Sequence, residues 1–466
     1  MTTIDDRAVS AFRENLAGSV LSPADDGYDE ARRVFNGEID RHPALIVRCA
    51  GPHDVAAALG YARDHGLEIT VRGGGHNLGG AAVADGALMI DLSTLRTVTV
   101  DAGARTARAG GGATNADLDA ACQEHGLAVT AGTNSETGIG GLTLGGGAGW
   151  LLSRHGLAID NLLSAEVVLA SGEIVRASAG SHPDLFWALR GGGGNFGVVT
   201  EFEYRLHPVG PLVQLGMFFW ELDKLADALR FSREIVASLP EGAGSMIAGI
   251  NAPPAPFVPT ELQGKPGLAL IIAGFDGPEA HAEVMTRIRA GLPAAFELVT
   301  PIPYVELQKM LDAGSPRGFL AYEKALYVSE LSDDVVDVIA THLPGKASPL
   351  SIMPIFPLGG VYARVPDDAT AFGGPRTDGF LIGAVTIAPT PELHAADRAW
   401  VRALWSALVP HSANLGGYVN FMSDYEEDRV RASYGKVKYD RLAEIKARYD
   451  PYNVFQHNAN IKPAHL

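Results

Sequence analysis

Short apolar runs alternate with a helix-period pattern and glycine turns between residues 40 and 210. Residues 44–49, 67–71 and 87–92 are apolar and rich in β-branched side chains, which is typical of strands. Residues 52–65 repeat apolar positions at helical spacing and stop at Gly66, so they predict a helix between the first two strands. This alternation predicts an α+β or α/β domain with unusually many glycine loops.

The pattern changes near residues 208–211, where a second region begins. Strand and helix patterns continue there, with an aromatic-rich strand at 215–220 and helices at 222–238 and 279–290. The proline-rich segments 252–256 and 301–303 are typical of loops. The second region therefore predicts a sheet covered by helices. Near the C-terminus, residues 439–449 predict a charged helix that Asp450 and Pro451 end.

Composition and charge exclude several function classes. The chain has 466 residues, enough for two or three domains, and its 37 basic against 54 acidic residues give a formal charge of −17. This charge disfavours nucleic acid or an anionic membrane as a partner. The two cysteines, Cys49 and Cys122, form no disulfide framework, and Cys122 is expected to be buried in a helix. The N-terminus shows no signal-peptide pattern, and no apolar stretch is long enough for a membrane span, so a soluble cytoplasmic protein is expected.

Four glycine clusters lie in the first region. They are residues 71–80, which include His76, and residues 110–112, 132–149 and 191–197. Glycine removes the Cβ atoms that keep a ligand away from the backbone, and converging backbone N–H groups bind anions such as pyrophosphate. Several such clusters in one domain predict a large ligand, such as a dinucleotide.

Other nucleotide, metal and hydrolase motifs do not fit. Gly192, Gly194 and Gly197 have the Gly-x-Gly-x-x-Gly spacing, but they follow a helix pattern and precede a strand, the reverse of the dinucleotide fingerprint. The Gly-Lys pairs ending at Lys265 and Lys346 lack the hydroxyl residue of a P-loop. No His-Glu-x-x-His or Cys-x-x-Cys motif indicates a metal, and no Gly-x-Ser-x-Gly elbow is present.

The chain resembles the berberine-bridge-enzyme-like branch of the vanillyl-alcohol-oxidase type of FAD-linked oxidases. The matching segments are residues 71–76, 138–141, 145–147, 154–161, 184–197, 418–420 and 449–455. The resemblance is strong over residues 40–210 and 415–465 and weaker between them, where 357–360 and 364–366 still fit.

The resemblance implies a two-part, PCMH-type FAD-binding domain and a substrate domain. Residues 1–210 and the returning segment 415–466 would bind FAD, and residues 211–414 would form an antiparallel sheet covered by helices. It also implies a covalent bond from His76 to the 8α-methyl group of the flavin. Many relatives attach the flavin a second time through a cysteine, where this chain has Asn134. Asparagine forms no thioether, so a single covalent link is expected.

The same resemblance implies a set of cofactor-binding residues besides His76. They are Arg72, Gly73, Gly74, Gly75, Asn77, Thr137, Gly138, Gly140, Gly141, Gly145, Asp160, Val199, Asn458 and Asn460. Thr137 stands where relatives control oxygen access to the flavin. His155 stands where relatives often carry a tyrosine, and Gln456 and Ala459 replace larger or charged residues.

For catalysis the resemblance implies Tyr418 as the base and Asn420 as a hydrogen-bonding partner of flavin or substrate. A phenol has a pKa of about 10, so Tyr418 needs a cation or another stabilising partner to act near neutrality, for which Lys324 and Arg364 are candidates. The alternative is that Tyr418 is a core aromatic residue with a satisfied hydroxyl. Tyr322 and Tyr327 fit packing and pocket lining equally well.

These observations favour an oxidase that transfers hydride from an alcohol or amine C–H bond to the flavin and then to O2, giving H2O2. A dehydrogenase of the same fold, a biosynthetic oxygenase and a non-catalytic flavin carrier remain open. Because the second region has few clustered cations, we expect a neutral, partly apolar small-molecule substrate. Sugars, alkaloid-like amines and polyketide alcohols all fit.

Overall fold

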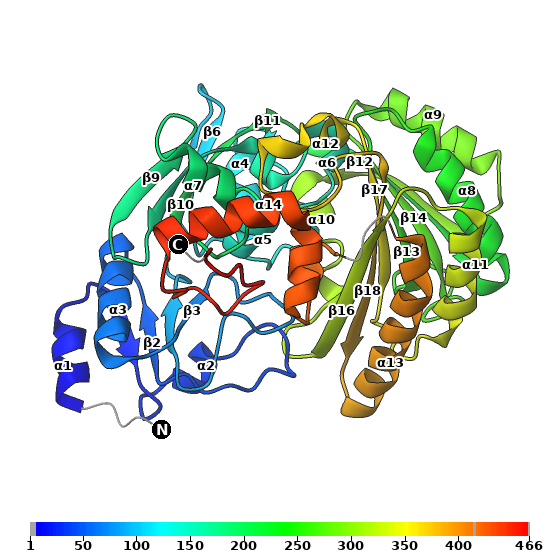
Figure 1. Cartoon of the computed structure of the whole chain (residues 1–466). Coiled ribbons are helices and arrows are strands. Elements are labelled where there is room, and N and C mark those ends of the chain that lie inside the picture. The colour runs from blue at the N-terminus through cyan, green and yellow to red at the C-terminus, as the bar shows by residue number, and fades with distance from the viewer. Residues whose placement is uncertain (1–5, 413–415, 465–466) are drawn as a thin grey trace.

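The structure is a computed structural model that describes residues 6–412 and 416–464. Its N-terminal part holds a four-stranded sheet in the order β1-β2-β4-β3, in which β2, β4 and β3 are parallel (Figure 1). The strands are β1 (Ser19–Leu21), β2 (Leu45–Arg48), β3 (Ile69–Arg72) and β4 (Leu88–Asp91). Helix α3 (Pro52–His65) joins β2 to β3 with the predicted bounds, and the three predicted strands are confirmed.

An antiparallel five-stranded sheet follows, in the order β5-β6-β10-β8-β9. Its strands are β5 (Val98–Asp101), β6 (Thr106–Gly110), β8 (Leu162–Val168), β9 (Ile174–Ser178) and β10 (Val198–Arg205). The strands β7 (Leu127–Ala128) and β11 (His207–Pro208) form a separate, short antiparallel pair. Helix α7 (Pro183–Leu189) precedes the last glycine cluster and β10 follows it, so the helix-then-strand order that excluded a Rossmann site is confirmed.

The middle of the chain forms an antiparallel seven-stranded sheet in the order β15-β12-β14-β13-β17-β18-β16. The strands are β12 (Leu212–Glu221), β13 (Gly244–Asn251), β14 (Pro266–Gly274), β15 (Phe296–Pro303), β16 (Leu320–Val328), β17 (Met353–Leu358) and β18 (Gly379–Ala388). One face packs against the helices α8 (Leu225–Ala237), α9 (Pro278–Arg289), α11 (Asp333–His342) and α13 (Pro391–Leu408) (Figure 1). The predicted fold class is thereby confirmed.

The prediction of a loop at residues 301–303 is wrong, because these residues end strand β15. Among the described strands, this strand is the edge of the seven-stranded sheet and pairs with β12, with Pro301 opposite Gln214 and Pro303 opposite Leu212. Proline has no N–H to donate, and an edge strand tolerates it where the missing donor faces no neighbouring strand. Residues two apart in a strand have the same orientation, so the backbone nitrogens of both prolines can face the edge of the sheet that has no neighbouring strand.

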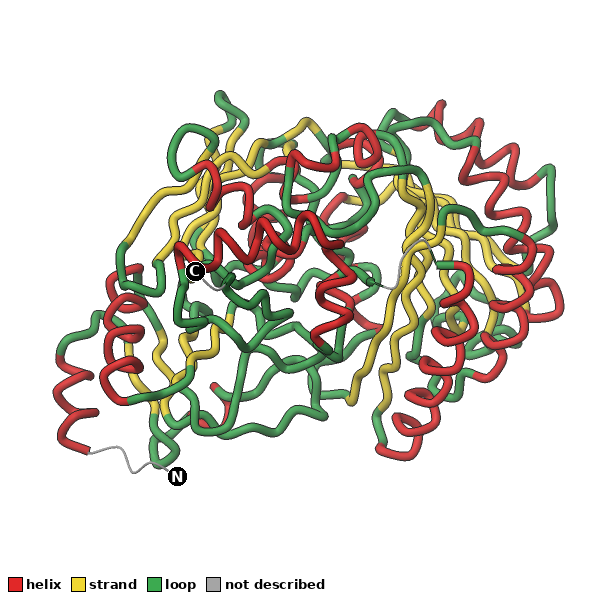
Figure 2. The backbone as a smooth tube through the Cα atoms, viewed as in Figure 1, coloured by secondary structure: helices red, strands yellow, loops and turns green. Residues whose placement is uncertain are grey.

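The C-terminal segment packs back onto the five-stranded sheet. Helix α14 (Glu427–Tyr449) is labelled in Figure 1 and is kinked at Gly435. It places Tyr439 and Leu442 in one apolar cluster with Trp187 and Phe202. In Figure 2 the strands gather on two sides of the molecule, with loops and helices between them. This packing supports the predicted division into two domains, which stays a proposal: residues 1–210 with the returning segment 415–466, and residues 211–414.

Shorter helical segments connect these parts. They are α1 (Asp6–Glu14), α2 (Tyr28–Ala31), α4 (Asn115–Gln123), α5 (Ile139–Gly145), α6 (Leu152–His155), α10 (Tyr304–Lys309) and α12 (Val361–Arg364), with single 3-10 turns η1 (Ala158–Asn161), η2 (Leu222–Lys224), η3 (Asp312–Gly314), η4 (Leu343–Gly345), η5 (Asp367–Ala369), η6 (Val409–His411) and η7 (Val419–Phe421). Within residues 6–412 and 416–464, no helix combines the length and apolarity that a membrane span requires. The same residues hold no cluster of metal-ligating side chains.

Helix α4 buries an acid that makes stability depend on pH. Asp119 is buried, and its Oδ2 accepts a hydrogen bond from Gln308 Nε2 at 3.0 Å while its Oδ1 has no partner among the described residues. Burial raises the pKa of Asp119 to about 7, against roughly 3.9 in an unfolded chain. The folded state therefore binds the proton more tightly, and this carboxyl destabilises the fold progressively as pH rises from about 4 to 7, by about 1.4 kcal/mol per pH unit.

We expect Asp119→Asn to remove this dependence, because the amide keeps the acceptor and cannot ionise. Urea denaturation of variant and parent at pH 5 and pH 8 checks it. The free energy of unfolding of the variant, relative to that of the parent, should be higher at pH 8 than at pH 5. An equal difference at both would contradict the assignment.

Candidate active site

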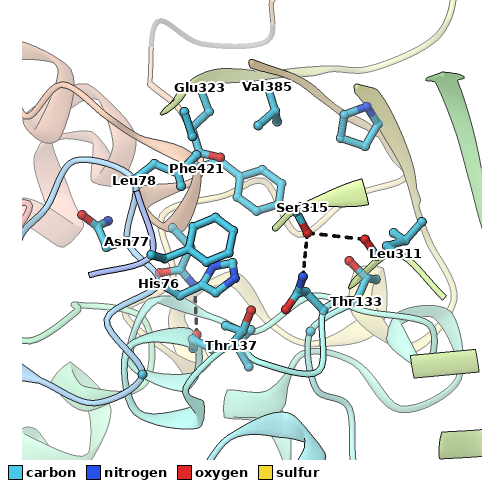
Figure 3. Close-up of a pocket in the computed structure, with 18 of the residues that line it drawn as sticks. His76, Asn77, Leu78, Thr133, Thr137, Leu311, Ser315, Glu323, Val385 and Phe421 are labelled. Carbon is cyan, nitrogen blue, oxygen red and sulfur yellow. Dashed lines mark hydrogen bonds between the residues drawn. The ribbon is translucent and has the colours of Figure 1, made fainter. Parts of the chain in front are cut away.

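A cavity of about 1200 Å³ lies between the glycine loops and the seven-stranded sheet (Figure 3). One wall is built from the loops after β3 and around α5, the region after α7, and the C-terminal segment 455–459. The opposite wall is one face of the seven-stranded sheet together with the residues after α10. Residues from all four predicted glycine clusters therefore line the same cavity.

Two of the glycine loops touch through their backbones. A Cβ atom on Gly74 would lie 2.4 Å from the backbone N of Gly138, and a Cβ on Gly138 would lie 2.3 Å from the backbone N of Gly74. Any side chain at either position would push the loops apart. The close approach leaves a wall of backbone atoms around His76.

His76 is half-buried in this wall, with its ring stacked on Phe35 at a centroid distance of 3.9 Å. Its Nε2 atom has no hydrogen-bond partner among the described residues. Burial, and then the charge of Arg317, lowers the pKa of His76 to about 4. The imidazole is neutral at pH 7, and the free nitrogen keeps its lone pair or proton for a ligand.

Asn134 lies on the same wall and is held by a residue of the middle region. Its Nδ2 donates a hydrogen bond to Ser315 Oγ at 2.8 Å, and Ser315 is labelled in Figure 3. The neighbouring Ser135 donates from its Oγ to Asp312 at 2.5 Å. Thr137 lines the cavity a few residues on, near His76 in Figure 3. These bonds fix the loop that carries Thr137 to the segment after α10.

Tyr418 and Asn420 lie together at the cavity. The Tyr418 hydroxyl oxygen accepts hydrogen bonds from the backbone N–H of Gly147 at 2.7 Å and from Asn420 Nδ2 at 3.0 Å. Asn420 Nδ2 also donates to the carbonyl of Leu142 at 2.9 Å. Burial raises the pKa of Tyr418 to about 12, and the donors from Gly147 and Asn420 counteract it because they stabilise the phenolate.

Gly145 makes this pairing possible. A Cβ at Gly145 would lie 2.0 Å from Asn420 Oδ1, so any side chain there would displace Asn420. Gly145 therefore leaves the space that Asn420 occupies beside Tyr418, and it does not line the cavity.

The two cations suggested for Tyr418 lie elsewhere. Lys324 pairs with Asp424 at 3.4 Å, and Arg364 is exposed and pairs with Glu241. Burial dominates the raised pKa of Tyr418, and the positive charge of Arg376 counteracts part of that rise.

Arg376 is buried, forms an ion pair with Asp160 at 2.8 Å and lies over the Phe372 ring at 4.9 Å. Asp160 was predicted to bind the cofactor, but its carboxylate is used by Arg376 and lies outside the cavity wall. The sequence holds no local signal for Arg376, because its partner is far away in the chain.

Most of the predicted site residues line the cavity. Those on the wall are Gly73, Gly74, Gly75, His76, Asn77, Thr137, Gly138, Gly140, Gly141, Val199, Asn458, Tyr418 and Asn420. Arg72, Gly145, Asp160 and Asn460 are not on it. The Arg72 guanidinium donates to the carbonyl of Ala31 and lies 4.0 Å from Asp91.

Three residues named from the sequence also lie off the wall. Tyr322 donates to Asp424, Tyr327 is buried next to Gly374, and His155 stacks on His207 at 3.7 Å. Their positions favour packing over contact with a ligand.

Two family descriptions match separate parts of the chain. The FAD binding domain matches residues 43–178, and the family "berberine and berberine like" matches residues 417–462. (R)-6-hydroxynicotine oxidase from Paenarthrobacter nicotinovorans is 30% identical over 459 residues, which cover 96% of this chain and 97% of that protein. The chain belongs to the berberine-bridge-enzyme-like family of FAD-linked oxidoreductases.

Solved structures of the family have the same fold. 6-Hydroxy-D-nicotine oxidase from Arthrobacter nicotinovorans superposes with a TM-score of 0.82 at 28% identity and covers 96% of this chain and 98% of its own. Glucooligosaccharide oxidase from Acremonium strictum, described with a 6-S-cysteinyl, 8α-N1-histidyl FAD, gives a TM-score of 0.83 at 24% identity and covers 98% of this chain and 100% of its own. The berberine-bridge-enzyme-like chain is thus an FAD-dependent oxidoreductase.

The residues of the cavity fit FAD. The glycine wall presents backbone atoms, and the buried atoms Thr70 Oγ1, His76 Nε2 and Asn458 Oδ1 on the wall have no partner within residues 6–412 and 416–464. No lysine or arginine of these residues lines the cavity, so backbone N–H groups would meet the pyrophosphate. Unsatisfied buried polar atoms are costly, and a bound dinucleotide would satisfy them.

Proposed function

We propose that this protein is an oxidase that takes hydride from a C–H bond of an alcohol or amine, with FAD bound covalently through His76 alone and O2 as the final acceptor. The carrying observation is the Tyr418 hydroxyl, which lies at the cavity between the donors Gly147 N–H and Asn420 Nδ2. FAD, when bound, supplies the hydride acceptor and passes the electrons to O2, giving H2O2.

His76 is proposed as the single tether. Its neutral ring carries a nitrogen without a partner, which is the form that bond formation to the flavin methyl group requires. The second attachment named for the Acremonium enzyme needs a cysteine, and both cysteines of this chain are buried away from the cavity wall. Asn134 has no sulfur, and its amide is engaged by Ser315.

Tyr418 is proposed to accept the proton of the substrate hydroxyl or amine as hydride leaves the adjacent carbon. The two hydrogen bonds and the charge of Arg376 stabilise the phenolate that this role requires. Asn420 holds the Tyr418 oxygen in place. The side chain of Asn420 is itself positioned by its hydrogen bond to the carbonyl of Leu142 and by the space that Gly145 leaves.

The cavity wall supports an apolar substrate body. The sheet face and the segment after α10 contribute mostly aliphatic and aromatic side chains, and the absence of lysine and arginine among the described lining residues disfavours an anionic substrate. Thr137 is small, which supports access of O2 to the flavin beside it.

Anaerobic mixing with panels of alcohols, amines and sugars tests the proposal through loss of the flavin absorbance. An active class should bleach the flavin, and air-saturated buffer should restore the colour rapidly with one equivalent of H2O2. Reoxidation over many minutes would indicate a dehydrogenase instead. Oxygen from O2 in the product would indicate an oxygenase, and a flavin that no panel bleaches would indicate a carrier.

A further inference from the structure

Every strand of the seven-stranded sheet contributes side chains to the cavity, and nearly all of them are apolar. The apolar residues are Leu298, Ile302, Leu215, Met217, Ile271, Met246, Ala248, Ile250, Pro354, Phe356, Val385, Ile387 and Ala321. The polar exceptions are Asn251, which accepts a hydrogen bond from Lys346, and Glu323. Glu323 is the ionisable residue of this face among the described lining residues.

Glu323 lies on β16, at the edge of the sheet opposite to β15. Its cross-strand neighbour is Val385, and both lie at the top of Figure 3, with Phe421 and His76 below them. The residue is 6% exposed. Within residues 6–412 and 416–464, no hydrogen bond or ion pair reaches its carboxylate, although its backbone N–H donates to Ser423 Oγ at 3.0 Å.

The charged groups of the neighbouring segments are already paired with other residues. Lys324, the next residue of β16, pairs with Asp424, and Arg317 lies 3.6 Å from Glu136. On the cavity side, Tyr425 accepts a hydrogen bond from Asn77 at 2.6 Å. His76 is neutral at pH 7. The buried carboxyl therefore faces the cavity without a protein cation.

We propose that Glu323 binds the ammonium group of a cationic amine, so that the cavity selects amines with an apolar body over alcohols of the same shape. This inference rests on the proposed function, because it takes the cavity as the substrate site, and it replaces the neutral substrate expected from composition. A buried carboxylate without a partner is costly, whereas an ammonium ion bound against it restores an ion pair and a charge-assisted hydrogen bond. An alcohol supplies only a neutral hydrogen bond.

The proposal implies a pH dependence of amine binding. Burial raises the pKa of Glu323 to about 8, so the free protein holds this group mostly protonated at pH 7. An ammonium ligand favours the carboxylate, and its binding releases the proton. Affinity for an alkylamine, which stays protonated up to about pH 9 or 10, should therefore rise between pH 6 and 8. Affinity for the alcohol should stay constant.

Binding of benzylamine and benzyl alcohol to the oxidised holoprotein tests the proposal, through perturbation of the flavin absorbance or by calorimetry. The two probes have the same aromatic body, and only the amine is charged. At pH 8 we expect the parent to bind benzylamine about tenfold more tightly, as for a hydrogen bond to a charged group. Glu323→Gln should reduce this preference to about twofold or less and remove its pH dependence, with benzyl alcohol binding unchanged.

Glu306→Gln is the matched control. Glu306 also lines the cavity, but it is exposed and pairs with Lys309 at 3.1 Å, so its variant should keep the preference. A parent that binds the amine no more tightly than the alcohol, or binds neither, would overturn the proposal, as would a Glu323→Gln variant that keeps the preference. Binding is measured without turnover. If the preference for the amine fails but alcohols bleach the flavin, the proposed function stands without this role for Glu323. If the preference holds and no compound bleaches the flavin, Glu323 binds amines but the proposed oxidase function fails.

Discussion

Tyr418→Phe should lower the rate constant of anaerobic flavin reduction by roughly 10²- to 10⁴-fold, the usual contribution of a general base. Phenylalanine keeps the buried ring and its edge contact with Phe372 at 5.9 Å, and removes only the oxygen that accepts the bonds from Gly147 and Asn420. Stopped-flow absorbance with a substrate found in the panel screen measures the effect. The flavin spectrum and content should be unchanged.

Tyr425→Phe is the control for loss of a buried cavity hydroxyl. Tyr425 also lines the cavity, and its hydroxyl accepts a hydrogen bond from Asn77, but it has no place in the proposed proton transfer. We expect its reduction rate to stay within about tenfold of the parent. In the parent the rate should rise with pH, because the pKa of Tyr418 lies above neutrality, and Tyr418→Phe should lose that rise. Equal effects of the two substitutions would assign Tyr418 to packing.

Lys446→Met should destabilise the fold by about 3–5 kcal/mol, because it leaves a buried carboxylate without its cation. Lys446 and Asp450 are fully buried and lie 2.7 Å apart. Lys446 Nζ also donates to the backbone carbonyls of Asn195 at 2.7 Å and Phe455 at 3.0 Å, so it joins α14 to the last glycine cluster and the C-terminal loop. That loop carries Asn458 to the cavity, and flavin content should fall as well.

The same helix offers a matched control. Lys436 and Asp440 have the same i, i+4 spacing, but the Lys436 side chain is 86% exposed. Lys436→Met should leave the urea midpoint unchanged, because solvent screens exposed ion pairs. The urea midpoints and flavin content of both variants check the prediction. A Lys446→Met protein as stable as Lys436→Met would show that the buried pair contributes little.

Local patterns predicted the elements whose signals are local. The helix Pro52–His65 follows from its apolar period, the proline at its start and Gly66 after it, and the helix-then-strand order around the last glycine cluster was readable from residues 183–204. The segment 301–303 was not, because its prolines are acceptable only at a sheet edge, and edge position is a property of the assembled sheet.

The site was predictable where backbone approach defines it. Gly74 and Gly138 belong to motifs that the sequence displays, and they meet in the fold. The role of Arg376 could not be predicted from the sequence, because it depends on Asp160, which is distant in the chain. Glu323 has a local signal in the sequence. It is a charged residue within an apolar strand, and the period of two places it on the face opposite to Tyr322 and Lys324.

Acid precipitation of the holoprotein tests most directly whether FAD is attached covalently through His76 alone. The parent should give a yellow pellet that keeps its flavin through acid and organic washes, and His76→Ala should give a colourless pellet with any FAD in the supernatant. Asn134→Ala, which touches the position of the second attachment in relatives, should keep the yellow pellet. A parent that releases its flavin, or a His76→Ala protein that retains it, would contradict the account.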